Sequence, residues 1–264
     1  MRPPRLWLAL VLCCSFAITL VAQNPSSSTP QALSTLQSAL QALTGNTATT
    51  DATLTGTASW FAGSDDETGT VVLKTISGAN RLDLSLSAGT RSEIRTGTVS
   101  GSVVGTWIGP DRVPHAMMDH NLMTDAGWFP AFTIGNLRSA SNVVATYIGV
   151  ETRNGSSVVH ISASQQFSSL PSASAALLQH LTKVDIYLDP STLLPVSYVY
   201  NSHPDDNAML DIPTEIRYSN YQTITGAQVP FRVQKFISST LILDLQFQNA
   251  SLNTGLTSTQ ITAQ

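Results

Sequence analysis

The chain has 264 residues, with 13 Lys or Arg against 17 Asp or Glu and a formal net charge of −4. Charged residues make up only 11% of it, whereas roughly 25% is average for a globular protein. Because no basic cluster appears either, the composition argues against a nucleic-acid partner. The neutral polar residues that replace the charges are typical of an exported sheet protein with one wet face.

The first residues form a predicted export signal. Arg2 and Arg5 make a basic start, residues 6–21 are an apolar run, and Ala22 precedes the polar Gln23. This order is that of a secretory signal peptide cleaved after Ala22. An uncleaved membrane anchor is the alternative, but the run is shorter than the ~20 apolar residues that a spanning helix prefers.

Both cysteines, Cys13 and Cys14, lie inside this signal. The exported chain would therefore contain no disulfide, and its stability must come from burial of a core. We expect a signal peptide at 1–22, a flexible Ser/Pro linker at 23–29 and a single domain at 30–264. After signal cleavage we expect no transmembrane segment.

A helix follows the linker. Thr29 is a suitable N-cap, Pro30 occupies the first helical position, and Gly45 is placed to end the helix. Leucines at spacings of three and four give it one apolar stripe, which predicts a helix docked on a sheet. These are Leu33, Leu36, Leu40 and Leu43.

Residues 52–106 change to a period of two. Leu82, Leu84 and Leu86 alternate with polar residues, and Leu54, Ala58 and Trp60 share one strand face. Alternation of this kind predicts antiparallel strands with one buried and one solvated face.

The strand pattern stops at residues 109–138, where we expect a short helix at 115–123. Beyond it, Asn154-Gly155 predicts a hairpin turn between two strands, and a second helix is expected at 172–182. The remaining strands are predicted at 183–188, 195–201, 214–218, 229–237 and 240–249.

Two segments near the end carry the most specific pattern. Residues 188–196 read Leu-Asp-Pro-Ser-Thr-Leu-Leu-Pro-Val, and residues 221–231 read Tyr-Gln-Thr-Ile-Thr-Gly-Ala-Gln-Val-Pro-Phe. Asp189-Pro190 favours a type I turn. Pro195 and Pro230 suit the starts of strands, where a missing N–H does least harm.

These segments resemble the LolA-like superfamily, which includes periplasmic lipoprotein carriers, lipid-binding lipoproteins and the large domain of a sigma-factor regulator. The resemblance implies an α+β fold, an antiparallel half-barrel sheet of about ten or eleven strands wrapped around two or three helices. It further implies an apolar cavity between sheet and helices that holds acyl chains. The matching residues are structural, so the resemblance assigns no catalytic or ligand-binding residue.

The break at 109–138 is the best candidate for ligand contact. It gathers three methionines and three aromatic residues, and flexible Met with aromatics suits a surface that accepts variable apolar shapes. Ordinary packing of a cover element onto the sheet is the alternative. The candidate ligand-binding residues, with two from the facing strands, are Met117, Met118, Met123, Trp128, Phe129, Phe132, Trp60 and Leu84.

No catalytic or metal signature stands out. His115 and Asp119 would share a helix face, but His120 would point about 100° away, and zinc needs three or four converging ligands. The loop with Asp205, Asp206 and Asp211 lacks the spacing of a known calcium site. We therefore expect no metal site, no cofactor and no enzymatic activity. A hydrolase that uses His115, Asp119 or His120 remains an alternative.

The leading hypothesis is thus a periplasmic or secreted envelope protein that binds an apolar ligand, either a lipid or the acyl chains of a lipoprotein. The alternative is an envelope sensor or scaffold module that binds other proteins through a sheet edge or through the 109–138 segment.

Overall fold

The computed structural model describes residues 27–97 and 103–262. The predicted signal peptide (1–22) and residues 23–26 of the predicted linker lie outside the described residues. Ser28 and Thr29, the end of that linker, are hydrogen-bonded to Val143 and Ala145. Among the described residues, no helix combines the length and the hydropathy needed to cross a membrane.

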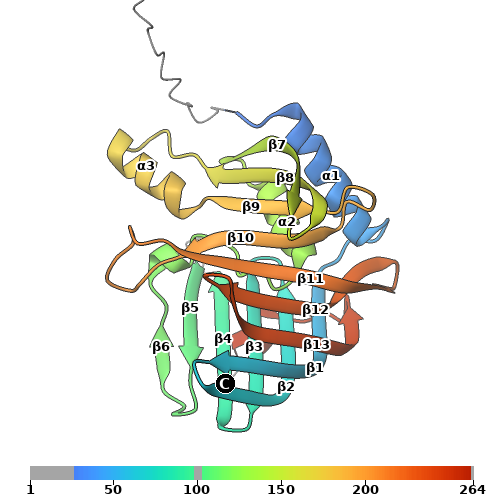
Figure 1. Ribbon diagram of the computed structural model, residues 1–264, viewed down its shortest axis with the longest axis vertical. Coiled ribbons are helices and arrows are strands. Elements are labelled where there is room, and N and C mark those ends of the chain that lie inside the picture. The colour runs from blue at the N-terminus through green and yellow to red at the C-terminus, as the bar shows by residue number, and fades with distance from the viewer. Residues whose placement is uncertain (1–26, 98–102, 263–264) are drawn as a thin grey trace, which may run out of the picture.

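The strands of the described residues form a single sheet. Its thirteen strands lie in the order β6-β5-β4-β3-β2-β1-β13-β12-β11-β10-β9-β8-β7, and every neighbouring pair is antiparallel (Figure 1). The strands are β1 (Asp51–Ala62), β2 (Asp65–Ile76), β3 (Ala79–Leu86), β4 (Gly89–Gly97), β5 (Val103–Ile108), β6 (Pro114–Ala116), β7 (Val143–Arg153), β8 (Ser156–Gln165), β9 (Val184–Leu188), β10 (Pro195–Ser202), β11 (Ile212–Ile224), β12 (Ala227–Ile237) and β13 (Thr240–Leu252).

The helices within the described residues are α1 (Pro30–Thr44), α2 (Pro130–Ser139), α3 (Ser172–Leu181), α4 (Ser258–Thr262) and the 3-10 turn η1 (Asp119–Asn121). The predicted α+β half-barrel is confirmed, because the sheet curves without closing and its two outermost strands, β6 and β7, are not paired with each other. It has more strands and more helices than expected. Whether residues 30–264 form one domain stays a prediction.

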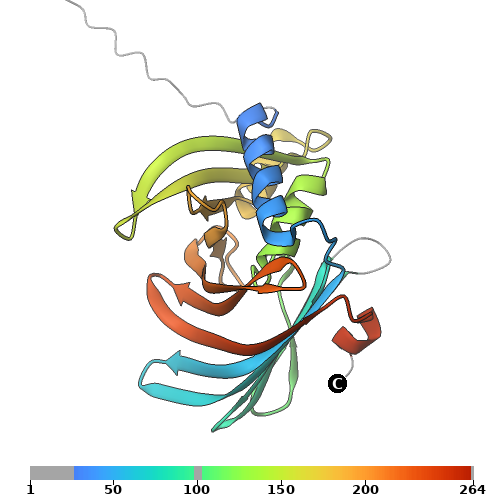
Figure 2. The ribbon, with the colours of Figure 1, turned by 90° about the vertical axis from the view of Figure 1, so that its right-hand side faces the viewer.

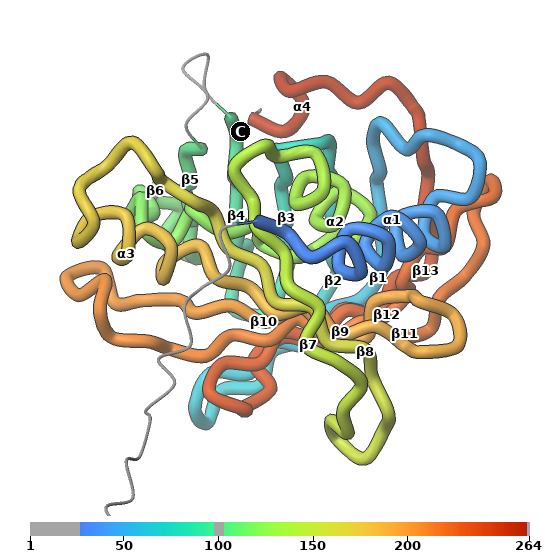
Figure 3. Tube along the Cα trace, turned by 90° about the horizontal axis from the view of Figure 1, so that it is seen from above, coloured from blue at the N-terminus to red at the C-terminus, as the bar shows by residue number. Residues whose placement is uncertain are grey.

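Helices α1 and α2 lie side by side on one face of the sheet, which we call the inner face (Figures 2 and 3). Thr29 caps α1 as predicted, its Oγ1 accepting a hydrogen bond from the Ala32 N–H at 3.2 Å. The buried stripe is rotated from the predicted one, since Leu33 is 45% exposed and alanines contact the core instead. The buried residues of α1 are Ala32, Leu36, Ala39 and Leu43.

The short helix predicted at 115–123 is wrong. Residues Pro114–Ala116 add β6 to the free edge of β5, and the Met117 N–H continues this pairing with the Gly105 carbonyl at 2.9 Å. Only Asp119–Asn121 makes a helical turn. The weak helix propensity of Asp119, His120 and Asn121 limits the helix to this one turn, and Pro114–Ala116 pair with the open strand edge instead.

Candidate ligand-binding site

The segment between β6 and α2, residues 117–129, packs against the inner face of the sheet. Polar contacts fasten it at three successive points. Arg95 Nη1 donates to the Thr124 carbonyl at 3.2 Å, Thr133 Oγ1 donates to Asp125 Oδ1 at 2.8 Å, and Tyr218 donates its hydroxyl to the Gly127 carbonyl at 2.6 Å. Burial raises the pKa of Tyr218 well above its ordinary value, so this hydroxyl remains a donor.

Two pockets border this segment. The first, of about 200 Å³, lies between residues 122–126, helix α2 and strands β8 and β9, and we call it the helix pocket. Met123, Leu137 and Val184 are among its apolar lining residues. The second, of about 270 Å³, is lined by Trp60, Trp107 and Trp128 and is called the tryptophan pocket.

Register explains why the tryptophan pocket collects these side chains. Trp60 of β1 is paired with Leu243 of β13, and Leu243 is paired with Lys235 of β12. Directly paired residues in an antiparallel sheet point to the same face. Leu82, Leu84 and Trp107 reach the inner face through their pairing with Glu93 and Arg91 of β4. The tryptophan pocket therefore has an aromatic and aliphatic wall with charged residues set into it.

Two ion pairs lie among these charges. Arg91 Nη2 is 2.6 Å from Glu67 Oε1, and the Arg91 guanidinium lies 3.9 Å from the Trp60 ring centroid. Arg95 Nε is 2.9 Å from Glu93 Oε1, which also accepts a hydrogen bond from Trp128 Nε1 at 3.4 Å.

Both carboxylates are held in the charged form. Burial by itself would raise the pKa of Glu93, but the charges of Arg95 and Lys235 and the Trp128 hydrogen bond bring it below its ordinary value. The hydrogen bonds from Arg91 and from the Ala88 N–H likewise lower the pKa of Glu67. The wall of the pocket thus carries fixed charges at neutral pH.

The eight residues that the sequence singled out are only partly brought together. Trp60, Leu84 and Trp128 line the tryptophan pocket, and Met123 lines the helix pocket. Phe129 and Phe132 are buried in the main core with their ring centroids 5.1 Å apart.

The other two methionines lie away from both pockets. Met117 packs over Gly105 of β5, where a side chain on the glycine would collide with its sulfur, and Met118 is 40% exposed. Trp107, Lys235 and the inward charges of β4 were not predicted from the sequence. The alternation of Arg91, Glu93 and Arg95 places them on one strand face, but it does not show that this face is the inner one.

The histidines and acids considered for a metal site serve elsewhere. His115 stacks on Trp107 with ring centroids 4.1 Å apart, while His120 Nε2 lies 3.1 Å from the Pro204 carbonyl oxygen. Across residues 27–97 and 103–262, no group of three or more His, Cys, Asp or Glu side chains is arranged to hold a metal ion.

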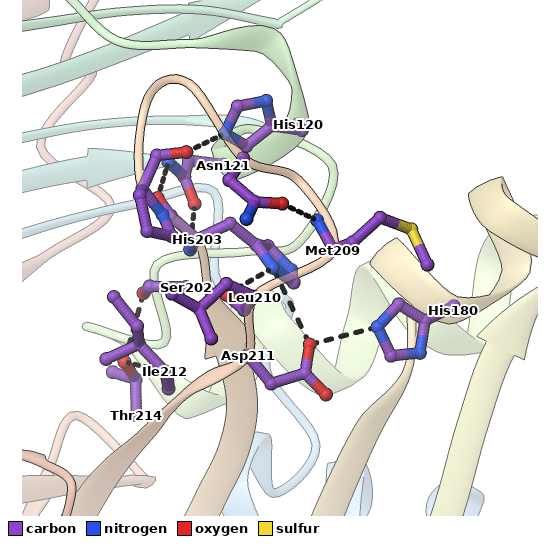
Figure 4. Close-up of polar contacts among 12 residues, drawn as sticks. His120, Asn121, His180, Ser202, His203, Met209, Leu210, Asp211, Ile212 and Thr214 are labelled. Carbon is purple, nitrogen blue, oxygen red and sulfur yellow. Dashed lines mark hydrogen bonds and ion pairs between the residues drawn. The ribbon is translucent and has the colours of Figure 1, made fainter.

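Three histidines nevertheless gather around the β10–β11 loop (Figure 4). The ring of His203 lies 5.9 Å from that of His120 and 6.0 Å from that of His180, measured between centroids. His180 Nε2 is 2.9 Å from Asp211 Oδ1, and Asn121 Oδ1 accepts the His203 N–H at 2.8 Å. The cluster ties the 117–129 segment and α3 to this loop.

His203 is buried, and its Nε2 has no hydrogen-bond partner. Burial lowers the pKa of His203, and the neighbouring His120 and His180 lower it further, whereas Leu210 and Asp211 oppose the shift. The neutral ring is therefore the form that the fold accommodates.

No protein-family model matches the sequence, and no curated protein matches it significantly. Solved structures match it in fold. An outer membrane lipoprotein-sorting protein domain from Vibrio parahaemolyticus has a TM-score of 0.56 and 13% identity, over 88% of this chain and 96% of its own. A LolA superfamily protein from Nitrosomonas europaea has a TM-score of 0.52 and 12% identity, over 84% and 93% of the two chains.

A DUF1329 family protein from Desulfovibrio piger is similar to the same degree, with a TM-score of 0.54 and 9% identity over 89% of this chain and 98% of its own. All three similarities extend over most of both chains. They concern the course of the backbone alone, because the sequence identities are only 9–13%. The chain therefore has the fold of the LolA-like superfamily, as residues 188–196 and 221–231 predicted.

Proposed function

We propose that this protein binds an apolar ligand, a lipid or the acyl chains of a lipoprotein, between its sheet and its helices, and that it does so without catalysis. One observation carries the proposal. The inner face of the sheet is not completely filled by the described chain, and the helix pocket and the tryptophan pocket both border the 117–129 segment.

Pocket size limits what can bind. The two volumes, about 200 and 270 Å³, lie below the roughly 300–1,000 Å³ of common ligand pockets. Each pocket accepts part of an acyl chain. A long chain needs both, and residues 124–128 must shift for it to pass from one to the other.

The fold similarity supports this class of ligand. One similar structure is named for lipoprotein sorting and another for the LolA superfamily. The predicted signal peptide supports a site of action in the periplasm or outside the cell, which is where a carrier of apolar cargo would work.

Native mass spectrometry of protein purified without detergent from its own envelope tests the proposal, together with uptake of a fluorescent fatty acid. We expect co-purified lipid and saturable uptake. Met123→Trp narrows the helix pocket and should reduce uptake of long chains. Val150→Trp, which adds a bulky ring at a position 60% exposed, is the control. A wild-type protein that carries no lipid and takes up no fatty acid would overturn the proposal.

A second candidate function is recognition of an envelope protein through the edge of β7 beyond Tyr147. Ser28 and Thr29 cover this edge from Val143 to Tyr147, but no strand in the described part of the chain pairs with it there, and Ile148 and Val150 are 53% and 60% exposed. Exposed apolar residues on an open strand edge suit addition of a partner strand. A stoichiometric complex that Val150→Lys abolishes and Val104→Lys preserves would support this function. Equal binding by both variants would refute it.

A further inference from the structure

We propose that the tryptophan pocket selects amphiphiles that carry one negative charge next to an acyl chain, and that Lys235 binds this charge. The inference rests on the proposed function, because it assumes that the pocket receives an apolar ligand. It adds the chemical class of the ligand and a residue that determines specificity.

The balance of charge in the pocket is the first argument. Three charged residues line the pocket, and two of them are paired with residues outside its lining: Arg91 with Glu67, and Glu93 with Arg95. Lys235, the remaining charged lining residue, makes no hydrogen bond or ion pair with any described residue. It acts on Glu93 only through space. The pocket therefore has one cation more than it has carboxylates.

The position of Lys235 is the second argument. Its pairing with Leu243 places it on the inner face, and its ammonium lies 5.5 Å from the centroid of the Trp128 ring. A lysine can lay its methylene stem along an apolar wall while its charged end stays accessible. Here that end borders the same pocket as Leu84 and Trp60. One ligand can therefore place its apolar body against these side chains and its charged end at the lysine.

The surrounding charges also decide the sign of the ligand. A cationic amphiphile would meet Arg91 and Lys235, while the one carboxylate in the lining, Glu93, is already paired with Arg95. A neutral amphiphile would leave Lys235 unpaired beside an apolar wall. An anion gives Lys235 its missing partner, and the low-polarity wall strengthens that attraction relative to open water.

The side chain of Lys235 limits the ligand to one chemical class. Its ammonium is a compact point charge, without the planar fork with which arginine selects bidentate anions. A carboxylate and a phosphate group both satisfy it, so the shared chemistry is an anionic oxygen at the end of an acyl chain. Fatty acids and lysophosphatidic acid are two sources of this chemistry.

Intrinsic fluorescence offers a direct test, because Trp60, Trp107 and Trp128 all line this pocket and Trp7, the fourth tryptophan, lies in the predicted signal peptide. Dibromostearic acid, its methyl ester and a brominated amine of equal length are titrated into the protein without its signal peptide. We expect the acid to quench at roughly tenfold lower concentration than the ester, and the amine to be the weakest ligand.

Variants assign the effect to Lys235. Lys235→Met should remove the advantage of the acid over the ester, and Lys235→Arg should restore most of it. Lys74→Met, on the outer face of β2, is the matched control and should behave as wild type. Thermal melting of each variant shows that it is folded. An acid and an ester that quench equally in wild type, or an unchanged preference in Lys235→Met, would overturn the inference.

The outcomes separate the two claims. Quenching by none of the three ligands defeats the proposed function in this pocket, whereas equal quenching by acid and ester defeats only the choice of charge. Competition between stearate and lysophosphatidic acid then identifies the source. Displacement at lower concentration by either one supports the proposal and names the preferred head, while displacement by neither overturns it.

Discussion

Gly127 is the position where the 117–129 segment depends most on the absence of a side chain. Its φ is +76°, and a Cβ built there would lie 2.7 Å from Tyr198 Cδ1 and 3.1 Å from Ile216 Cγ1. Both neighbours are almost fully buried and cannot easily move away. Gly127→Ala therefore introduces backbone strain and steric overlap at once.

The expected cost combines these two effects. A left-handed backbone costs a non-glycine residue about 1–2 kcal/mol, and overpacking of a core adds about 1–3 kcal/mol. We expect the free energy of unfolding to fall by about 2–5 kcal/mol. Urea unfolding followed by tryptophan fluorescence measures this loss and includes the adjacent Trp128.

Gly63→Ala is the matched control. Gly63 has a similar φ of +65°, but no atom lies within 4 Å of the position that its Cβ would occupy. It should show only the backbone cost of about 1–2 kcal/mol. If the two substitutions destabilise equally, the 117–129 segment does not pack against β10 and β11 as described, and the reasoning about the pockets fails with it.

Three further predictions concern single side chains. The pKa of His203 is lowered in the fold, so the neutral ring contributes fully to stability above the ordinary histidine pKa of about 6.5. This contribution is lost as the pH falls from there through the pKa of His203 in the folded protein. The urea midpoint of His203→Gln should therefore depend less on pH than that of wild type. Arg95→Met removes the ion-pair partner of Glu93, whose side chain is 18% exposed; the cost at neutral pH should be below the about 3–5 kcal/mol of a fully buried pair, and smaller still in acid, where Glu93 can take up a proton. Asp189→Ala removes the acceptor of the Ser191 and Thr192 N–H groups, at 2.9 and 2.8 Å, and should lower thermal stability by about 1–2 kcal/mol without changing ligand uptake.

Local chemistry made the turns and many strands predictable. Asp189 accepts the hydrogen bonds that its Asp-Pro context favours, and Asn154 and Gly155 both adopt the positive φ that their hairpin turn requires. Leu82, Leu84 and Leu86 are buried on one face, as their alternation indicated. These features depend on residues close together in sequence, so one sequence suffices to predict them.

The face of β4 was harder to read. Ile94 looks like its core residue, yet it packs with Ala79 and Ile261 on the opposite face, beneath α4. The inner face receives Glu93 and Arg95 instead, which neutralise each other. An alternation pattern cannot predict this exchange, because it depends on the C-terminal helix and on a charge pair formed within one strand.

Helix α2 was missed for a related reason. It begins at Pro130, a favourable first position, but it contains Thr133, Ile134 and Gly135, which are weak helix formers. Contacts with α1 and burial of Phe132 stabilise it instead. Its position defines the helix pocket, so the location of the candidate site depended on tertiary contacts that the sequence pattern does not contain.

The polar anchors of the 117–129 segment set a length threshold for any acyl ligand. A chain that fills one pocket and extends into the other must displace the hydrogen bonds made by Arg95, Thr133 and Tyr218. At about 1 kcal/mol net for each bond, this costs about 3 kcal/mol. A buried methylene contributes about 0.8 kcal/mol, so roughly four additional methylenes offset the opening. We therefore expect affinity to stay constant over a few added methylenes and then to rise again with chain length. The reason is that hydrogen bonds, rather than apolar packing alone, separate the two pockets.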